Sequence, residues 1–508
     1  MAELESDHYD VIVIGTGLAE SIAAASLAKA GQSVLHLDPN VYYGGEQASL
    51  TLDELSSWSN TINQSSSSSA SSSSSCHSSS IRYHSSSTTP LTPQLENDRR
   101  RYSLSLFPSI LPSRGSLIDT LIASDVSKYV SFKLLDSTSI YAEEGVKKVP
   151  GSKEEIFKDK SIGLVDKRKL MKFLLFATGE FENDDLLKGK EDQPLSTFLQ
   201  GTFSIPQQLT ESISYAIAHC SSPNDQTLPA LQRTRRYLKS IGRYGGSAFL
   251  VGQYGGAGEV AQGFCRACAV FGGTYVLGPT AAPTSIETTP DGVLIQIPCH
   301  PRPVTASHLV SAPIHLPPSL LTCSNTDTKE TTSSNCIAIT ATLPEALRRR
   351  SLSVEEDDEE KPEPENDDTA VIVFPREENA VRAYINGEGT GSCPAGQYII
   401  YLSTAASSPS TSPSAILRPY LQKITNEPTF EAYYVATRPS YDAIKPESTG
   451  NLVILEPYIG DYMLTEGLDW EAKQGEKAYY AIMGREGKGF FEKDPTDEEE
   501  MGFGEDDL

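Results

Sequence analysis

The sequence predicts an α/β protein in which a domain of several β-sheets is interrupted by a helical domain. Two stretches of the 508-residue chain carry this prediction. Residues 9–46 read as β-α-β: an apolar strand, a glycine turn, an alanine-rich helix and a second apolar strand. Residues 152–242 contain three amphipathic segments at helical spacing, and strand-like segments resume after them. The three helical segments are residues 167–181, 207–220 and 230–246.

The order of these segments sets the expected domain boundaries. We expect the sheet domain to begin over residues 1–151, to be interrupted by the helical domain at residues 152–242, and to continue over residues 243–485. An acidic tail covers residues 486–508. In the last part of the sheet domain, residues 258–278 read as a helix, a Gly-Gly turn and a strand.

Two insertions interrupt the sheet domain. A serine-rich tract lies at about residues 47–100, and an acidic tract lies at about residues 353–368. Both have little apolar surface with which to offset the entropy lost on ordering. We therefore expect both insertions to be disordered, and the acidic tail to be solvated in the same way.

The charge of the chain limits the partners that it can bind. The formal net charge is −25, from 67 acidic and 42 basic residues. Such a chain repels nucleic-acid backbones and anionic membrane surfaces, and it suits a basic protein partner. No apolar run approaches the roughly 18–20 residues that span a bilayer, and the first residues resemble no targeting signal. We expect a cytoplasmic protein that contacts membranes only transiently.

The glycine turn after the first strand departs from a working dinucleotide fingerprint. Gly15 and Gly17 fill the first two glycine positions, but Glu20 stands at the third. A carboxylate there would compete with a diphosphate for the helix N-terminus and repel it. Asp38 follows at the distance of a ribose ligand, and the pattern leaves two interpretations open. Asp38 either binds the ribose of a flavin or nicotinamide cofactor, or it only ends the strand; Glu20 favours a loop without a cofactor.

No other motif indicates catalysis. The eight histidines are dispersed, and no nucleophile elbow, zinc-protease helix or P-loop occurs. Cys265 and Cys268 form one C-x-x-C pair inside a predicted helix, without a second pair to complete a zinc site. We expect two buried, reduced thiols and no metal site.

Two further segments have the character of a binding surface. In residues 40–46, two adjacent tyrosines precede Gly-Gly, an arrangement that predicts one ring packed inward and one facing solvent; packing of both rings is the alternative. In the predicted helix of residues 258–271, three polar side chains share one face: Glu259, Gln262 and Arg266. The apolar side chains Val260, Phe264, Ala267 and Phe271 fall on another face. By periodicity alone, the polar face is an ordinary solvated helix surface.

Three segments together resemble a known protein family. They are residues 9–46, residues 149–176 and residues 243–278, and they match in order and spacing the segments shared by Rab GDP-dissociation inhibitors and Rab escort proteins. The resemblance implies a flavoprotein-like (FAD/NAD(P)-binding-like) multi-sheet domain without a working cofactor. It also implies an inserted helical domain, in agreement with the interpretation of residues 152–242.

The resemblance also implies a surface that binds GDP-bound Rab GTPases. By matching motifs, this surface falls on Tyr43, Glu259 and Arg266, with Gln262 and Thr274 nearby. Val276 stands where relatives often have methionine. The protein would then be a non-catalytic binding component.

Within the family, the sequence favours the escort branch. Residues 264–273 are closer to the escort version of this helix, and the insertions and length agree with it. An escort protein presents unprenylated Rab to the Rab geranylgeranyltransferase heterodimer and delivers the prenylated product to membranes. The alternatives are a dissociation inhibitor that recycles prenylated Rab and, outside the family, a flavin-dependent oxidoreductase.

The geranylgeranyl lipid on the Rab tail would need an apolar pocket between helices. Candidate residues lie on one face of the first helical segment and on a later helix. They are Leu170, Phe173, Leu174, Ala177, Ile213 and Ile217. The alternative is that these side chains form the core of the helical domain.

Overall fold

The computed structural model describes most of the chain. The described residues are 4–68, 81–142, 145–150, 156, 159–160, 162–321, 330–348, 366–438, 450–456, 458, 464–486 and 489–492. Of the acidic tail, residues 486 and 489–492 are described, and Phe491 is buried, so the expected solvation is wrong for this residue. Residues 493–508 lie outside the described residues, as does the acidic insertion up to residue 365.

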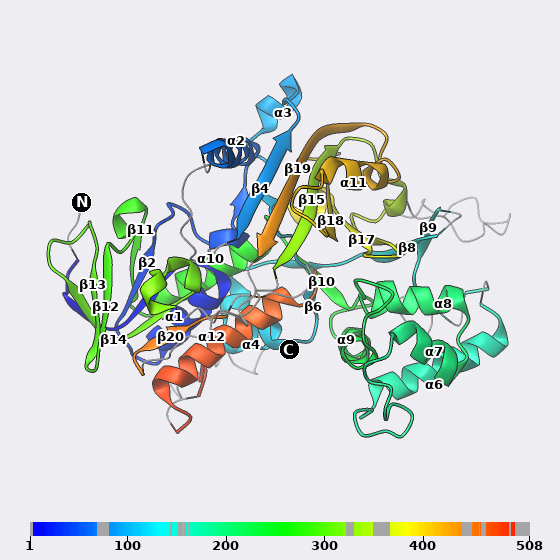
Figure 1. Ribbon diagram of the computed structural model, residues 1–508, viewed down its shortest axis with the longest axis horizontal. Helices are drawn as coiled ribbons and strands as arrows, with labels where there is room; N and C mark the ends of the chain where they lie inside the picture. Colours follow the sequence, from blue (N-terminus) through cyan, green and yellow to red (C-terminus); the bar gives the residue numbers. More distant parts are fainter. Residues whose placement is uncertain are drawn as a thin grey trace, which may run out of the picture.

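The predicted β-α-β unit is present at the start of the chain. Strand β1 (His8–Ile14) pairs in parallel with β2 (Val34–Asp38), and helix α1 (Leu18–Lys29) connects them. The strands form because their side chains are apolar and almost all buried, and the alanines of α1 allow close helix packing. This unit forms the centre of a seven-stranded sheet (Figure 1).

The seven-stranded sheet has the order β11-β2-β1-β14-β13-β12, with β20 paired to β14. The pairs that β1 makes with β2 and β14 are parallel, and β12 and β13 form an antiparallel hairpin. The other strands are β11 (Thr274–Leu277), β12 (Ser285–Thr289), β13 (Gly292–Gln296), β14 (Val304–Ser311) and β20 (Leu452–Ile454). Strand β11 is therefore at an edge of the sheet, beside the end of β2.

A second, eight-stranded sheet has the order β4-β19-β15-β18-β17-β16-β8-β9 and is mostly antiparallel. Its strands are β4 (Arg82–Thr88), β8 (Ser137–Ala142), β9 (Gly145–Lys148), β15 (Thr331–Thr340), β16 (Thr369–Phe374), β17 (Val381–Asn386), β18 (Tyr398–Ala405) and β19 (Pro428–Arg438). Helix α11 (Pro413–Leu421) covers one face with the buried side chains Leu417 and Leu421.

Two small sheets connect the large ones. One has the order β6-β10-β7 and the other pairs β3 with β5. Their strands are β3 (Ser49–Leu50), β5 (Leu104–Ser105), β6 (Leu111–Pro112), β7 (Phe132–Leu134) and β10 (Phe249–Gly252).

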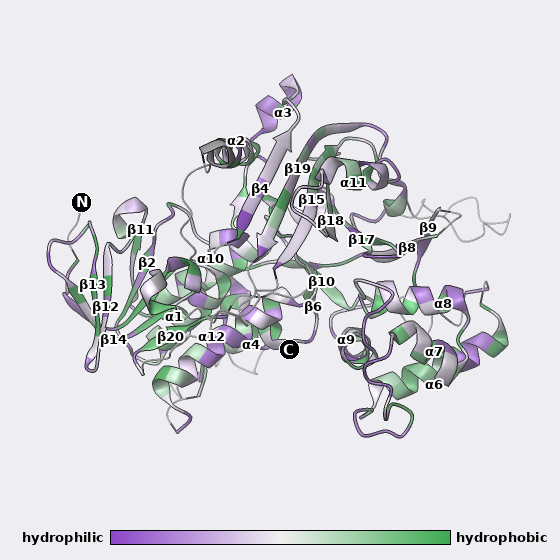
Figure 2. Ribbon diagram, viewed as in Figure 1, coloured by the Kyte–Doolittle hydropathy of each residue, from purple (hydrophilic) through white to green (hydrophobic). Residues whose placement is uncertain are grey.

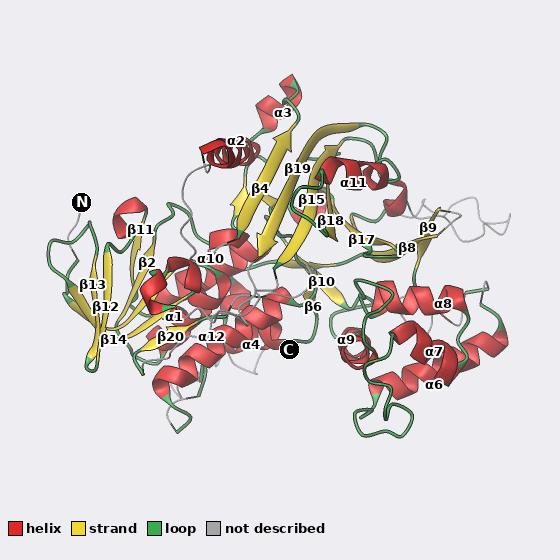
Figure 3. Ribbon diagram, in the orientation of Figure 1, coloured by secondary structure: helices red, strands yellow, loops and turns green. Residues whose placement is uncertain are grey.

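Four helices pack together on one face of the seven-stranded sheet (Figure 3). They are α1, α4 (Ser116–Ala123), α10 (Ala257–Val270) and α12 (Gly467–Met483). Helix α12 approaches α1 closely at Gly475, where an added Cβ would lie 2.5 Å from Cγ2 of Ile22. The contacting faces are apolar, which is visible as green stretches facing the sheets in Figure 2. This packing fixes α10 against the β-α-β unit.

The predicted helical segment forms a separate layer in the lower right of Figure 1. Its helices are α6 (Leu164–Thr178), α7 (Leu195–Phe203), α8 (Gln207–Glu211), a π-helical stretch (Ser212–Ile217) and α9 (Thr227–Ser240). Sequence reasoning missed α7, which is only nine residues long. The apolar core of this layer is continuous with that of the eight-stranded sheet, since Phe173 and Val373 belong to the same buried cluster.

The prediction of disorder is wrong for the parts of the serine-rich tract that the structure describes. Helix α2 (Leu52–Ser68), strand β4 and helix α3 (Pro93–Asp98) lie within residues 47–100. The reason is local: Leu52 and Leu55 are fully buried, and Trp58 packs edge-on against Tyr83 and Tyr434. The serine run covers residues 65–80; its first four serines end α2, and residues 69–80 lie outside the described residues.

The end of the acidic insertion is also ordered. Asp367 is buried, and the Asp368 carboxylate accepts a hydrogen bond of 2.9 Å from the Lys133 ammonium. The predicted disorder is therefore wrong for these last residues, because each carboxylate has a cationic partner: Lys148 lies 3.6 Å from Asp367.

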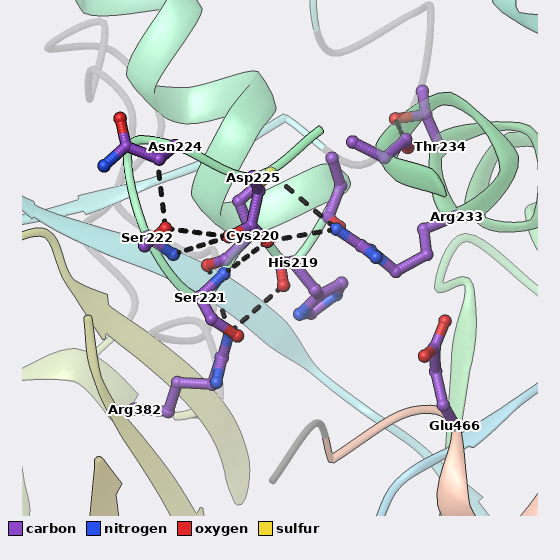
Figure 4. A network of polar contacts seen from close by, with 12 residues as sticks. His219, Cys220, Ser221, Ser222, Asn224, Asp225, Arg233, Thr234, Arg382 and Glu466 are labelled. Atoms are coloured by element: carbon purple, nitrogen blue, oxygen red, sulfur yellow. Dashed lines mark hydrogen bonds and ion pairs between the residues drawn. The ribbon is translucent and has the colours of Figure 1, made fainter. Parts of the chain in front are cut away.

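A buried arginine joins the helical layer to the eight-stranded sheet (Figure 4). Nη2 of Arg382, on β17, donates to the carbonyls of His219 and Cys220 at 3.1 and 3.0 Å and to Oγ of Ser221 at 3.1 Å. The backbone N–H of Ala380 donates to the carbonyl of Ser221 at 2.7 Å. The loop after the π-helical stretch is thus fixed to the sheet.

None of the described helices combines the length and apolar character that crossing a bilayer requires.

Candidate functional site

The glycine loop between β1 and α1 is filled by side chains of the chain itself. An added Cβ on Gly17 would lie 2.5 Å from Oε2 of Glu20, and one on Gly15 would lie 2.7 Å from Nε2 of His315. Gly15 has φ of +100°, which glycine adopts without strain. The Glu20 carboxyl therefore folds back over the loop at the place where a diphosphate would approach the backbone.

Asp38 at the end of β2 is fully engaged by its neighbours. One carboxylate oxygen accepts from the backbone N–H and hydroxyl of Thr16 at 2.8 and 2.5 Å, and the other accepts from the backbone N–H and side-chain amide of Asn40 at 2.8 and 3.0 Å. With two bonds to each oxygen, the carboxylate ties the glycine loop to the end of β2. The second interpretation of Asp38, that it ends the strand, agrees with these contacts.

Burial changes the ionisation of the glycine-loop carboxyl. Desolvation raises the pKa of Glu20 to about 8, with smaller contributions from the neighbouring carboxyls of Glu471 and Asp38. Near pH 7 this carboxyl is therefore mostly neutral. The raised pKa weakens the expected charge repulsion of a diphosphate by Glu20, and the carboxyl also opposes a cofactor by occupying the space. Together with Asp38 and His315, it makes a loop that does not fit a dinucleotide.

The tyrosine-glycine segment and the start of α10 lie in direct contact. Gly44 has φ of +96°, and an added Cβ there would lie 3.2 Å from Cα of Gly258. An added Cβ on Gly258 would lie 2.8 Å from the carbonyl oxygen of Gln47. Two separate motifs of the sequence therefore meet in the fold, because glycines on both sides let the backbones approach.

The two adjacent tyrosines divide as expected. Tyr42 is exposed, and the half-buried Tyr43 packs edge-on against Tyr275, with ring centroids 6.0 Å apart. Tyr43 is the inward ring of the pair, although it is the one that the family resemblance assigns to binding.

The polar face of α10 borders this contact. Glu259 is half-buried, and desolvation raises its pKa above the usual range; Gln262 and Arg266 are exposed. The Arg266 guanidinium lies 4.6 Å above the ring of Tyr129, which is itself 48% exposed. Sequence reasoning missed Tyr129, since no motif connects it with a helix more than a hundred residues later.

The opposite face of α10 is buried, with one exception. Val260, Phe264 and Ala267 are at most 4% exposed. Phe271 was expected with them, but it is 43% exposed because α10 ends at Val270 and the chain turns there. Its ring instead faces the Lys29 ammonium at 5.8 Å.

The thiols of the C-x-x-C pair are buried, as expected. Cys265 and Cys268 are free, and burial raises their pKa to about 12 and about 11. Sγ of Cys265 lies 3.2 Å from the Ser21 hydroxyl. Across the part of the chain that the structure describes, no group of three or more potential ligands is placed to hold a metal ion.

The edge strand β11 carries two further candidate residues, on the face of the sheet opposite α10, where Val276 packs with the cluster of Ile12 and Leu37. Thr274 and Val276 are half-buried, and β11 pairs with β2 so that Val276 lies opposite Leu37. We define the platform as Tyr43, Glu259, Gln262, Arg266, Thr274 and Val276.

The six candidates for a lipid pocket lie in the helical layer. None is more than 7% exposed, and all belong to one buried cluster: Leu170, Phe173, Leu174, Ala177, Ile213 and Ile217. In this conformation they pack against one another as core, so a lipid chain would reach them only if helices moved apart.

Curated proteins of similar sequence match most of this chain. The Rab proteins geranylgeranyltransferase component A of Saccharomyces cerevisiae is 31% identical over 416 residues, which are 79% of this chain and 62% of that protein. The chain thus spans less than two thirds of the length of that relative.

Solved structures share the fold. The Rab GDI of Plasmodium falciparum superposes with a TM-score of 0.65 at 19% identity, covering 94% of this chain and 99% of that one. An oxidoreductase from Methanosarcina mazei superposes with a TM-score of 0.52 at 12% identity, covering 92% of this chain and 100% of that one. Both likenesses confirm the predicted fold class.

A family match connects the fold with the two motifs of the platform. The GDP dissociation inhibitor family matches residues 5–340, which include both the tyrosine-glycine segment and α10. Because this match covers more than half of the 508 residues, the chain belongs to the GDP dissociation inhibitor family.

Proposed function

We propose that this chain is a Rab escort protein, a non-catalytic component that binds GDP-bound, unprenylated Rab GTPases and presents them to Rab geranylgeranyltransferase. The observation that carries the proposal is the contact between the tyrosine-glycine segment and α10, in a chain that is 31% identical to a transferase component A. Tyr43 and Glu259 are next to the two glycines of this contact, and Arg266 follows on the same helix.

The chemistry of the platform suits a protein partner. Arg266 offers an exposed guanidinium beside the exposed ring of Tyr129, and such arginine and aromatic pairs dominate binding energy at many interfaces. Glu259 and Gln262 add a carboxyl and an amide on the same helix face. We assign the recognition of Rab to these groups.

The prenylated product explains the need for an escort. A geranylgeranyl chain exposes about 20 carbons, and each CH₂ removed from water contributes about 0.8 kcal/mol. Transfer from the escort to a membrane exchanges one apolar surrounding for another, so the helical layer could release the chain to a bilayer at little net cost. We assign lipid binding to the helical layer, with α6 moving away from its neighbours.

A dissociation inhibitor that recycles prenylated Rab is the second candidate, since it uses the same platform. The name of the yeast relative favours the escort branch. The flavin-dependent oxidoreductase has less support, because its likeness to this chain is one of fold and the glycine loop does not fit a dinucleotide.

The direct test is stimulation of geranylgeranyl transfer to unprenylated, GDP-loaded Rab by the purified chain together with the transferase heterodimer. We expect stimulation by the wild type and a loss of Rab affinity of about tenfold or more in Arg266→Ala. Arg100→Ala, an exposed arginine near α3, is the matched control and should behave as the wild type. Unchanged Rab affinity in Arg266→Ala would contradict the platform assignment, and Rab binding without stimulated transfer would favour the recycling inhibitor.

A further inference from the structure

A cavity of about 390 Å³ lies beside the glycine loop, between α1, α12 and the ends of the eight-stranded sheet. This volume is within the usual range for small-molecule sites. Gly17 and Glu20 form one wall, Glu471 of α12 forms another, and Trp58 and Tyr83 contribute aromatic rings. None of the described residues that line the cavity belongs to the platform.

The charged groups that face the cavity are predominantly acidic. Of the described residues, four carboxyl groups line it against one guanidinium: Glu20, Glu46, Glu456, Glu471 and Arg438. Arg438 is engaged by the chain itself, because it donates to the Tyr458 carbonyl at 3.1 Å and lies 4.3 Å over the Phe107 ring. His315 also lines the cavity, and burial lowers its pKa, so that it adds no charge near neutrality.

Glu20 is the group that points to a ligand. It is 93% buried, since only 7% of its surface is exposed, and it lines the cavity. Among the residues that the structure describes, its carboxyl has one hydrogen-bond donor, its own backbone N–H. A buried carboxyl with so few partners is unfavourable unless a donor from outside the chain reaches it.

The other carboxyls differ in their partners. Glu471 accepts 2.6 Å from the Gln47 amide, and Glu456 pairs with the Lys477 ammonium at 2.9 Å. The Oε1 atom of Gln47 is buried and accepts no hydrogen bond within the described part of the chain. Among the described residues, Glu20 is thus the lining carboxyl that lacks a partner on another residue.

We propose that this cavity binds a small organic cation bearing primary ammonium groups. Ammonium supplies several hydrogen-bond donors and a charge opposite to that of the lining, and the rings of Trp58 and Tyr83 favour a cation further. A metal ion is a poorer occupant, since the described carboxyls do not cluster as ligands. The cavity would thus bind a positively charged ligand, whereas the diphosphate of a dinucleotide is negatively charged.

Binding should release a proton. The Glu20 pKa of about 8 means that the empty site holds a proton near pH 7, and an ammonium beside the carboxyl would favour the ionised form. Glu471, whose pKa burial raises to about 7, contributes in the same direction. An uncharged ligand of the same shape would leave the protonation of Glu20 and Glu471 unchanged.

Titration calorimetry with 1,4-diaminobutane at pH 7 and 150 mM salt tests the proposal. We expect saturable binding whose heat differs between phosphate and MOPS buffers, neither of which carries a primary ammonium, because the released proton is taken up by the buffer. Glu20→Gln should bind about ten- to a hundredfold more weakly and lose the buffer dependence. Glu471→Gln provides a second variant should the first fail to fold. Glu378→Gln removes an exposed carboxyl outside the cavity and should match the wild type.

Four results would overturn the proposal: no saturable binding to the wild type, equal binding by Glu20→Gln, equal binding of 1,4-butanediol, or stoichiometric binding of FAD at the same site. Binding of GDP-loaded Rab to the same preparations reports separately on the proposed function. Either inference can therefore fail while the other holds.

Discussion

Gly44 and Gly258 lie against each other, so closely that a Cβ on Gly44 would be 3.2 Å from Cα of Gly258. This approach brings the tyrosine-glycine segment to the start of α10. The platform depends on this approach, because Tyr43 directly precedes Gly44 and Glu259 directly follows Gly258.

The first prediction concerns this contact. In Gly258→Ala the new Cβ would lie 2.8 Å from the Gln47 carbonyl oxygen, so the loop or the helix must shift. We expect a loss of about 1–3 kcal/mol in the free energy of unfolding and weaker Rab binding, measured by urea denaturation and a Rab pull-down titration. Gly201→Ala is the control: no atom lies within 4 Å of its Cβ position on α7, and it should stabilise by about 0.5–1 kcal/mol. Unaltered stability of Gly258→Ala would contradict the close approach.

A second prediction addresses the joint between the sheet and the helical layer. Arg382→Met removes three hydrogen bonds to the loop of residues 219–221 and leaves buried carbonyls without their donor. We expect the free energy of unfolding to fall by about 2–5 kcal/mol, measured by urea denaturation. Arg100→Met, at an exposed position, should change it by less than about 0.5 kcal/mol. Equal stability of the two variants would show that the joint does not depend on Arg382.

The third prediction is a pH dependence caused by Glu20. Its pKa of about 8 in the folded chain lies above the ordinary value of 4.5, so the folded state holds a proton that the unfolded state releases. The contribution of Glu20 to the free energy of unfolding therefore falls as the pH rises from about 4.5 to 8, by about 1.4 kcal/mol per pH unit.

Glu20→Gln should remove that slope. Unfolding of the variant and the wild type, compared at pH 5, 6, 7 and 8, should show the variant gaining relative stability at each step. Glu378→Gln, which lies on the surface, should follow the wild type. A constant difference between Glu20→Gln and the wild type across this range would contradict the raised pKa.

The fourth prediction tests lipid binding in the helical layer. Phe173→Ala removes a fully buried ring and should destabilise the chain by about 3–5 kcal/mol. The cavity that it leaves should accept part of an isoprenoid chain without helix movement. We therefore expect geranylgeranyl-cysteine methyl ester to raise the melting temperature of the variant more than that of the wild type. Phe374→Ala opens a comparable cavity in the eight-stranded sheet, and an equal gain there would argue against a site in the helical layer.

Much of the fold could be predicted because the relevant signals are local. The strand from Val11 to Ile14, the glycine turn and the alanine-rich helix form one contiguous pattern, and α10 shows its buried face by periodicity. The sequence also predicted the buried thiols at Cys265 and Cys268, since a helix face decides their environment.

The errors arose where distant segments determine the outcome. The composition of residues 47–100 predicts disorder, yet Trp58 is ordered by Tyr434, almost four hundred residues later in the chain. The neutral state of Glu20 depends on burial by several elements, and Tyr129 reaches Arg266 only through the fold. No pattern in one short window contains such contacts.

The hydrogen bonds that Asp38 accepts from Thr16 and Asn40 have a consequence for protein engineering. Restoring glycine at position 20 would reopen the turn, but the aspartate would still be committed to its own chain, and the His315 ring would still lie against Gly15. Conversion of this scaffold into a redox enzyme would therefore require changes around Asp38 and His315 as well as at position 20.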